Sequence, residues 1–250
     1  MSVLKSWIRQ TLRRRGYLVQ KYPISEFKTV PVFDLSVRLL MAIRGEQVTF
    51  VQVGANDGRY GDPLHDYISR HPWEGILVEP QPDLFTKLRE NYAAAADRLI
   101  FENVAIAQGV GELAMYRGKN GGPSDDGVFA ASVVSASPQV VARQLGVQIG
   151  DLERFTVPCA TLDDLVVKHG LSGLDLLQID TEGHDYNVLK TLDLSKTRPW
   201  IIQFEHGHLT PREITGALEH LNGHGYRVLF GGHQTDTLAL REDFLEPHSP

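Results

Sequence analysis

The sequence predicts an α/β fold in which helices cover a mostly parallel sheet, with an antiparallel C-terminal strand and a helical extension at the N-terminus. From residue 48 onward, short runs rich in β-branched residues alternate with amphipathic stretches, which is the order of a parallel sheet with helices on both faces. The last two apolar runs follow each other directly, as in a hairpin that forms an antiparallel edge. The composition, 42% hydrophobic and 22% charged, is that of an ordinary globular domain.

Apolar runs bounded by turn residues mark the expected strands. In chain order these runs are VTFVQVG (48–54), WEGILVEP (73–80), LIFENVAIA (99–107), LDLLQID (174–180), PWIIQFEHG (199–207), YRVLFGG (226–232) and DTLALR (236–241). The run GELAMYR (111–117) is expected to add a further strand. Residues 117–135 are expected to form one long irregular insert, and inserts of this length are usually functional or mobile.

Helices are expected between the strands, where apolar residues recur at helical spacing. The expected segments are 64–70, 82–96, part of 157–170, 184–192 and 211–225. Pro82 and Pro211 suit a first helical turn, because proline lacks the N–H group that has no partner there. Thr161 or Asp163 is expected to cap the third helix, and Gly170 to end it.

The first 45 residues are expected to form a helical extension that precedes a domain of residues 46–250. Within residues 1–20, apolar side chains can share one side of a helix that is otherwise basic. Such a helix either touches an anionic membrane or a partner, or packs on the domain. The net charge of −6 argues against a nucleic-acid partner. The single cysteine, Cys159, excludes an internal disulfide, and the lack of a secretion signal favours a cytoplasmic location.

The stretch FVQVGANDGRYGD (50–62) joins a strand to a glycine turn. Gly54 ends the strand and Gly58 follows soon after, so the backbone can approach a ligand closely, although a plain strand-to-helix turn has the same pattern. Glu79 ends the next strand, where a carboxylate can accept hydrogen bonds from both hydroxyls of a ribose. Together the turn and the acid predict a ligand that contains adenosine.

The glycine spacing separates two adenosine cofactors. A dinucleotide site needs G-x-G-x-x-G at the start of a helix, whose N-terminus holds the pyrophosphate. The order Gly54-Ala55-Asn56-Asp57-Gly58 does not fit this spacing, and Asp57 would repel a pyrophosphate. S-adenosylmethionine has a cationic sulfur and tolerates an acid. This cofactor is therefore favoured over NAD, and an NAD-dependent oxidoreductase is kept as an alternative.

Six motifs follow one another in order across residues 48–240: VQVGANDGRYGD, GILVEPQPDLFTKLRENY, ENVAIA, TLDDLV, LLQIDTEGHDYNVLK and FEHG. As a set they resemble the FkbM family of S-adenosylmethionine-dependent methyltransferases. The resemblance implies the class I methyltransferase fold, which is Rossmann-like. It also implies methyl transfer to a hydroxyl oxygen of a polyketide or a sugar.

The resemblance implies cofactor contacts at four places: the first loop, the end of the second strand, the segment beside the adenine and the acidic motif after the fourth strand. In this chain the corresponding residues are Gly54, Asn56, Asp57 and Gly58, then Glu79, then Asn103 and Ala105, then Asp180 with Glu182 and Gly183. Two positions depart from the pattern. Gln52 stands where many methyltransferases have an acid that helps to hold the methionine amine. Asp185 stands where the family often has a glutamate.

Methyl transfer to oxygen is a direct displacement that depends on positioning, and a hydroxyl acceptor benefits from a general base. We hypothesise that His206 or His184 is this base and that Asp180 and Glu205 orient substrate or cofactor. The alternative is that both histidines only cap a helix or form local hydrogen bonds. Asp180, Glu205 and His206 also offer ligands for a divalent cation, which the spacing neither requires nor excludes.

The predicted function is therefore O-methylation of a hydroxylated small molecule or glycan with S-adenosylmethionine as the methyl donor. A hypothesis of another class stays open, in which the chain is a nucleotide-binding module without catalysis that recruits a partner through its basic N-terminal helix. Turnover of S-adenosylmethionine with an acceptor separates the two.

Overall fold

The computed structural model describes residues 31–109, 111–119, 133–171, 173–233 and 236–244. The helix expected within residues 1–20 and most of the expected insert 117–135 lie outside the described residues. Residues from Pro31 onward belong to one compact unit. The division of the chain at residue 45 stays a prediction. Among the described residues, no helix combines the length and the apolar character that a membrane span requires.

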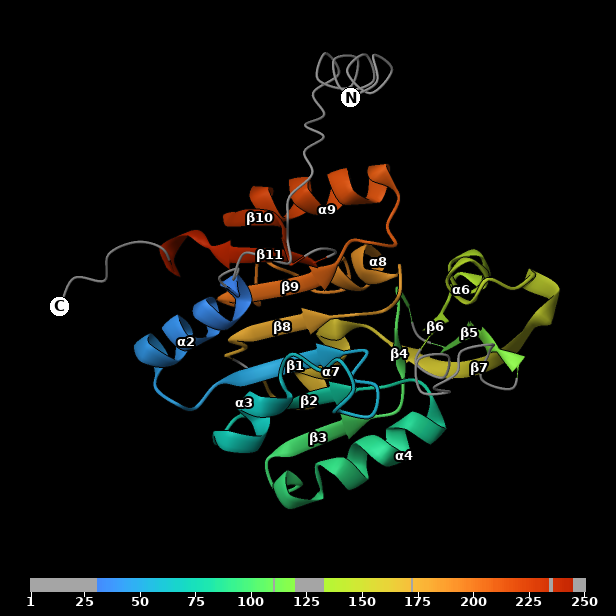
Figure 1. Cartoon of the computed structure of the whole chain (residues 1–250). Coiled ribbons are helices and arrows are strands. Elements are labelled where there is room, and N and C mark those ends of the chain that lie inside the picture. The colour runs from blue at the N-terminus through green and yellow to red at the C-terminus, as the bar shows by residue number, and fades with distance from the viewer. Residues whose placement is uncertain (1–30, 110, 120–132, 172, 234–235, 245–250) are drawn as a thin grey trace, which may run out of the picture. The chain divides into compact units, whose positions relative to one another are not determined.

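Within the described residues, seven strands form the main sheet in the order β10-β11-β9-β8-β1-β2-β3 (Figure 1). All neighbours from β9 to β3 are parallel, whereas β11 is antiparallel to both β9 and β10. The mostly parallel α/β sheet with an antiparallel C-terminal strand is thus confirmed. The strands are β1 (Thr49–Val53), β2 (Glu74–Val78), β3 (Leu99–Glu102), β8 (Leu176–Ile179), β9 (Ile201–Glu205), β10 (Tyr226–His233) and β11 (Asp236–Arg241).

The closing hairpin forms the expected antiparallel edge of the main sheet. Strand β11 inserts between β9 and β10, so that β10 lies at the edge of the sheet. Residues 237–240 of β11 are all buried, which explains why this strand lies inside the sheet rather than at its border.

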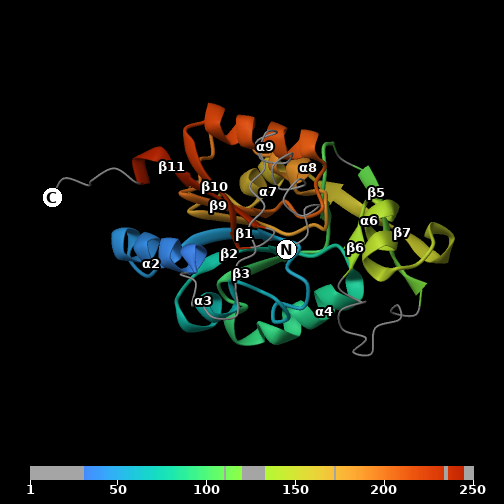
Figure 2. The ribbon, with the colours of Figure 1, turned by 45° about the horizontal axis from the view of Figure 1, so that its top comes forward.

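Helices pack on both faces of the main sheet (Figure 2). Alternate residues of each strand point to opposite faces, so Phe50 joins one apolar cluster and Val51 the other. The helices on the Phe50 face are α2 (Val32–Arg44), α3 (His65–Arg70) and α4 (Pro82–Asn91), and those on the Val51 face are α7 (Leu162–Lys168), α8 (Asp185–Leu189) and α9 (Pro211–Gly223).

The start of α7 confirms one of the two expected caps. Thr161 Oγ1 accepts a hydrogen bond from the backbone N–H of Asp164 at 3.0 Å, and the Asp164 carboxylate accepts one from the Thr161 N–H at 3.1 Å. This reciprocal pair is a capping box, so Thr161 rather than Asp163 is the cap. Thr210 and Glu213 form the same arrangement at the start of α9.

A second sheet, with the strand order β4-β7-β5-β6 among the described residues, lies near the carboxyl ends of the parallel strands (Figure 1). The expected third strand, 99–107, is divided into β3 and β4 at Asn103 and Val104. The Asn103 side chain donates hydrogen bonds to the carbonyl oxygens of Glu79 and Pro80, at 2.8 and 3.1 Å, which ties the break to the end of β2. The elements of this part are β4 (Ala105–Ile106), β5 (Gly111–Gly118), β6 (Val134–Ser135), α6 (Pro138–Leu145) and β7 (Leu152–Ala160).

Two neighbouring leucines of helix α2, one buried and one exposed, test whether this helix is packed in the core. Leu40 is fully buried, whereas its neighbour Leu39 is 45% exposed. We expect Leu40→Ala to lower the free energy of unfolding by about 3 kcal/mol, because it removes methyl groups and leaves a cavity. We expect Leu39→Ala to change it by less than about 0.5 kcal/mol. Urea denaturation of both variants measures the difference, and equal values would show that α2 is not anchored to the sheet.

Candidate active site

A cavity of about 260 Å³ opens at the carboxyl ends of β1, β2 and β8. Its walls come from the loop after β1, the ends of β2 and β8, and the second sheet. Of the sequence-predicted residues, it is lined by Gly54, Asn56, Glu79, Ala105, Asp180 and His184. The cavity is therefore located where ligands bind in open α/β sheets. The lining does not include Asp57, Gly58, Asn103, Glu205 or His206.

The two glycines of the first loop have different roles. Gly54 has φ of +80°, and a Cβ on it would overlap the carbonyl oxygen of Asp180 on the neighbouring strand. Gly58 has φ of +73°, and a Cβ on it would overlap Tyr92 and come within 2.8 Å of Leu88 on α4. Gly54 therefore lets β1 and β8 approach each other beside the cavity. Gly58 instead makes room for side chains that pack below the loop.

Asn56 and Asp57 shape the same loop. Asn56 has φ of +52°, and its backbone N–H donates to Glu79 Oε2 at 2.9 Å. Asp57 Oδ1 accepts hydrogen bonds from the N–H groups of Arg59 and Tyr60, both at 2.9 Å. The carboxylate of Asp57 thus holds the turn, and the cavity is lined by Asn56 instead.

Glu79 lies at the end of β2 and is only 4% exposed. Besides the bond from Asn56, its Oε1 accepts a hydrogen bond from the Gln81 N–H at 2.8 Å. Burial raises the pKa of Glu79 to about 7, although both N–H groups favour the ionised form. Two backbone donors fix the carboxylate, and each oxygen keeps a lone pair for a hydroxyl of a ligand.

Four carboxylates gather after β8 and β9, namely Asp180, Glu182, Asp185 and Glu205. Burial, followed by the charges of Asp185 and Glu182, raises the pKa of Asp180 well above its usual range. Burial and the charges of Asp180, Glu182 and Asp185 raise the pKa of Glu205 to about 9. This edge of the sheet is therefore short of positive charge.

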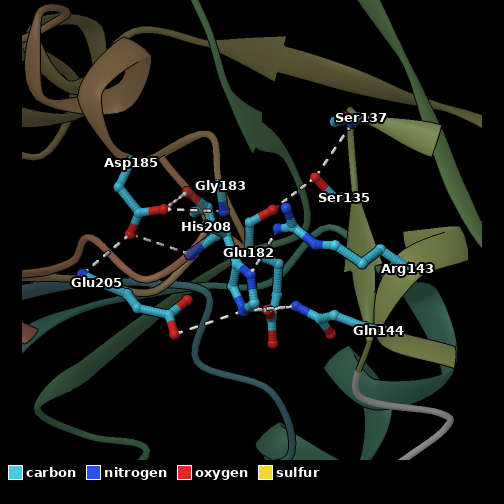
Figure 3. Close-up of polar contacts among 10 residues, drawn as sticks. Ser135, Ser137, Arg143, Gln144, Glu182, Gly183, Asp185, Glu205 and His208 are labelled. Carbon is cyan, nitrogen blue, oxygen red and sulfur yellow. Dashed lines mark hydrogen bonds and ion pairs between the residues drawn. The ribbon is translucent and has the colours of Figure 1, made fainter. Parts of the chain in front are cut away.

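Asp185 holds the loop between β8 and α8 (Figure 3). Its carboxylate accepts hydrogen bonds from Thr181 Oγ1 at 3.1 Å, from the Gly183 N–H at 3.2 Å and from the Glu205 N–H at 3.3 Å. Burial raises the pKa of Asp185 to about 6. The aspartate at this position thus ties the ends of β8 and β9 together, and it does not line the cavity.

His208 lies between two of the carboxylates (Figure 3). Its Nε2 is 3.3 Å from Glu182 Oε2 and 3.6 Å from Glu205 Oε1. Gln144 of α6 contacts both Glu182 and His208 Nε2, the latter at 2.7 Å. Ser135 of β6 also donates a hydrogen bond to the Glu182 carbonyl at 2.8 Å. The second sheet and α6 thus hold the acidic loop from outside.

Among the described residues, Glu182, Glu205 and His208 form the one group whose ligand atoms are close enough to hold a metal ion, all within 4.8 Å. This set shares only Glu205 with the set expected from the sequence, which was Asp180, Glu205 and His206. Asp180 lies on the cavity side, and His206 Nδ1 lies 3.0 Å from Thr237 Oγ1. Metal dependence stays a hypothesis for this chain.

His184 lines the cavity at the start of α8, directly after the acidic loop. Burial lowers the pKa of its imidazole, which keeps the ring neutral near physiological pH. Its Nδ1 lies 3.4 Å from Asn187 Nδ2. A neutral imidazole beside a ligand cavity can accept a proton, so His184 meets the geometric requirement for a base better than His206 does.

Sequence reasoning did not assign Asp62, Gln178 or Gln144 to the site, and it noted Gln52 only as a departure from the methyltransferase pattern. Gln52, Asp62 and Gln178 line the cavity, and Gln144 contacts its acidic loop. Gln178 could have been noticed, because it is a polar residue inside an apolar strand run. Nothing in the sequence marks Gln144, which only the packing of α6 brings near the site.

The family model described as the methyltransferase FkbM domain matches residues 52–228. A crystal structure of an FkbM methyltransferase from Methylobacillus flagellatus KT is 13% identical, with a TM-score of 0.49 over 78% of this chain and 44% of that one. This chain thus spans less than half of the Methylobacillus protein. No curated protein matches the chain.

Two further solved structures are similar to the chain. The N-terminal domain of human METTL16, in complex with SAH, is 13% identical, with a TM-score of 0.44 over 95% of this chain and 80% of that one. The precorrin-6y C5,15-methyltransferase from Geobacter metallireducens GS-15 is 14% identical, with a TM-score of 0.43 over 89% of this chain and 100% of that one. The family model covers well over half of the chain, and the main sheet has the expected Rossmann-like arrangement. The chain belongs to the FkbM methyltransferase family.

Proposed function

We propose that the cavity binds S-adenosylmethionine and that the chain transfers the methyl group to a hydroxyl oxygen of a sugar, a glycan or a secondary metabolite. The observation that carries this proposal is the chemistry of the lining. Glu79 offers a fixed carboxylate at the end of β2, and Asp62, Asp180 and Glu182 add further acids. Among the described residues, no Lys or Arg lines the cavity.

This lining suits a cationic adenosine ligand better than a dinucleotide. A pyrophosphate needs basic side chains or the N-terminus of a helix. Among the described residues no Lys or Arg lines the cavity, and α3 begins only at His65, well beyond Gly54. S-adenosylmethionine has a sulfonium and an ammonium group, and an acid-lined cavity lowers the energy of both. The NAD-dependent alternative is therefore not favoured.

The residues that would hold the cofactor follow from the geometry. Glu79 would accept hydrogen bonds from the two ribose hydroxyls. The apolar side chains of Leu84, Val104 and Ile106 lie along the cavity and would pack on the adenine. Bound S-adenosylmethionine supplies an activated methyl group whose carbon is attacked by an acceptor oxygen in line with the sulfur.

The acceptor oxygen must lose its proton, and His184 is the group that would take it. The imidazole lines the cavity and is held neutral by burial. Burial and the neighbouring acids raise the pKa of Asp180, which favours its protonated form, and a protonated carboxyl can donate a hydrogen bond that orients the acceptor. Acceptors that are themselves uncharged alcohols, such as sugars, fit a site that already has several acids.

A pair of variants tests this assignment. We expect His184→Asn to lower kcat by about 10²–10⁴, which is the usual contribution of a general base, while the affinity for S-adenosylmethionine is kept. We expect His206→Asn to retain most of the activity, because His206 does not line the cavity. Transfer of a radioactive methyl group measures both. The opposite pattern would assign the base to His206.

The proposed function is tested by incubating the purified chain with S-adenosylmethionine that has a tritiated methyl group and with a panel of sugars, sugar nucleotides, polyketides and phenols. We expect one class of hydroxylated acceptor to become labelled on oxygen, with stoichiometric release of S-adenosylhomocysteine. Labelling on nitrogen or carbon would contradict O-methylation. Tight binding of the cofactor without transfer to any class would favour the non-catalytic module.

A further inference from the structure

The second sheet has two apolar faces. One face packs on α6, in a cluster that contains Val133, Val141 and Leu145. The opposite face forms a separate cluster, to which no helix contributes a side chain among the described residues. Neighbouring residues of a strand point to opposite faces, so Tyr116 joins the cluster on α6 and Met115 joins the other one. The second face is therefore apolar without being covered by α6.

The cavity opens onto this second face. Its lining includes Leu113 and Met115 of β5, Val134 of β6 and Ala136, and all four belong to the second cluster. We call these four residues the apolar wall. Met115 and Val134 are each 7% exposed, and Leu113 and Ala136 are half-buried, so a ligand in the cavity can touch them. Covering such a surface with an apolar group is favourable, because it removes the surface from water.

The apolar wall lies at the His184 end of the cavity. Ser135, next to Val134 on β6, donates a hydrogen bond to the Glu182 carbonyl oxygen at 2.8 Å, which ties β6 to the loop after β8. Glu79 follows β2, which is separated from β8 by β1. Neighbouring strands lie about 4.8 Å apart, so the ends of β8 and β2 are roughly 10 Å apart. An adenosine bound at Glu79 therefore leaves the wall free for the second substrate.

We propose that the apolar wall holds the methyl acceptor, and that this acceptor is an alcohol or a phenol with an apolar body rather than a sugar. This inference rests on the proposed function and narrows its acceptor. The wall consists of hydrocarbon side chains and one thioether, whereas Glu182 and His184 offer polar groups at the same end of the cavity. An apolar body against the wall and a hydroxyl beside His184 would match both surfaces.

A sugar matches this arrangement poorly. Its hydroxyl groups surround the ring, so some of them would face the wall whichever oxygen approached His184. Those groups would lose their hydrogen bonds to water, and the four wall side chains offer them no strong partner in return. The composition of the wall thus selects against acceptors that are polar on every side.

Val157 of β7 provides a matched control. It belongs to the same cluster as Val134 and is 3% exposed, but it does not line the cavity. Val134→Thr and Val157→Thr therefore add the same hydroxyl, without a change of size, to one cluster, and only the first can meet a ligand. Leu113→Thr is a second wall variant, at a half-buried strand position that suits threonine.

The test uses 1-naphthol, which has one hydroxyl on an apolar body, and methyl glucoside, which is polar on every side. The protein is first saturated with S-adenosylhomocysteine. We expect the wild type to bind 1-naphthol at one saturable site, without release of S-adenosylhomocysteine, and not to bind methyl glucoside. Val134→Thr and Leu113→Thr should each weaken 1-naphthol roughly tenfold, because the new hydroxyl faces an apolar ring. Val157→Thr should stay within about twofold of the wild type, and all three variants should bind S-adenosylhomocysteine normally.

Calorimetric titration gives the affinities, and near-ultraviolet circular dichroism shows that each variant is folded. Leu113→Thr serves if Val134→Thr does not fold. The acceptor subsite is rejected, while the proposed function still stands, if 1-naphthol does not bind, if methyl glucoside binds more tightly, or if the wall variants and Val157→Thr lose 1-naphthol equally. Displacement of S-adenosylhomocysteine by 1-naphthol would also reject it, because the wall would then belong to the adenine. Wild-type protein that does not bind S-adenosylhomocysteine would reject the proposed function, and the acceptor subsite with it.

Discussion

Gly54→Ala is expected to lower the free energy of unfolding by more than about 4 kcal/mol, which is at the extreme of single substitutions. The new Cβ would overlap the Asp180 carbonyl oxygen, so β1 and β8 would have to separate at the centre of the sheet. The positive φ adds about 1–2 kcal/mol of strain for any residue with a side chain. We therefore expect little folded protein, measured by urea denaturation and circular dichroism.

Gly109→Ala is the matched control. Gly109 has φ of +92°, similar to that of Gly54, but a Cβ on it meets nothing within 4 Å. In this variant the free energy of unfolding should fall only by the strain of the positive φ, about 1–2 kcal/mol. Equal losses in the two variants would mean that the close approach of β1 and β8 at Gly54 does not matter.

Glu79→Gln is expected to weaken the binding of adenosine ligands by about a hundredfold or more. Two hydrogen bonds from ribose hydroxyls to a carboxylate are worth about 1.5–3 kcal/mol each, and an amide replaces one acceptor with a donor. The amide keeps the size of the side chain and one of its two backbone contacts. Calorimetric titration with 5′-methylthioadenosine measures the loss. Glu74→Gln, at the exposed start of the same strand, is the control that should bind normally.

The same residue predicts a dependence on pH. Burial raises the pKa of Glu79 to about 7 in the protein without ligand. The ionised form accepts the ribose hydroxyls, so affinity should be constant above pH 8 and fall as the pH drops through 7. By pH 6 the fall should approach tenfold, because a unit below the pKa most of the carboxyl groups are protonated. In Glu79→Gln the affinity should not change over this range. The same slope in both proteins would remove Glu79 from the ligand site.

The main sheet could be predicted because each strand has its own signal in the sequence. Runs such as 48–54 and 174–180 are apolar and bounded by turns, and the glycine turn and Glu79 stand where parallel strands end. The second sheet was harder to predict. Strands β4 and β6 have two residues each, and β5 pairs with β7 across the insert, so only long-range packing defines them.

The same limit applies to the site. Glu79 and Asp180 could be predicted because each follows a parallel strand. The carboxyl ends of these strands meet at one edge of the sheet. Proximity in the sequence was a poorer guide in the loops, where Asp57 accepts hydrogen bonds from its own turn and Gly58 packs on α4. Gln144 comes from a helix that the strand pattern did not indicate, and it reaches Glu182 only in the folded chain.

The central claim is that the cavity beside Glu79 binds S-adenosylmethionine, and calorimetric titration of the purified wild-type chain tests it most directly. With S-adenosylmethionine, S-adenosylhomocysteine and NAD as separate ligands, we predict saturable binding of the first two at one site and none of NAD. Tighter binding of S-adenosylmethionine is expected, because its extra positive charge enters an acid-lined cavity. Saturable binding of NAD, with no heat from either sulfur compound, would contradict the account.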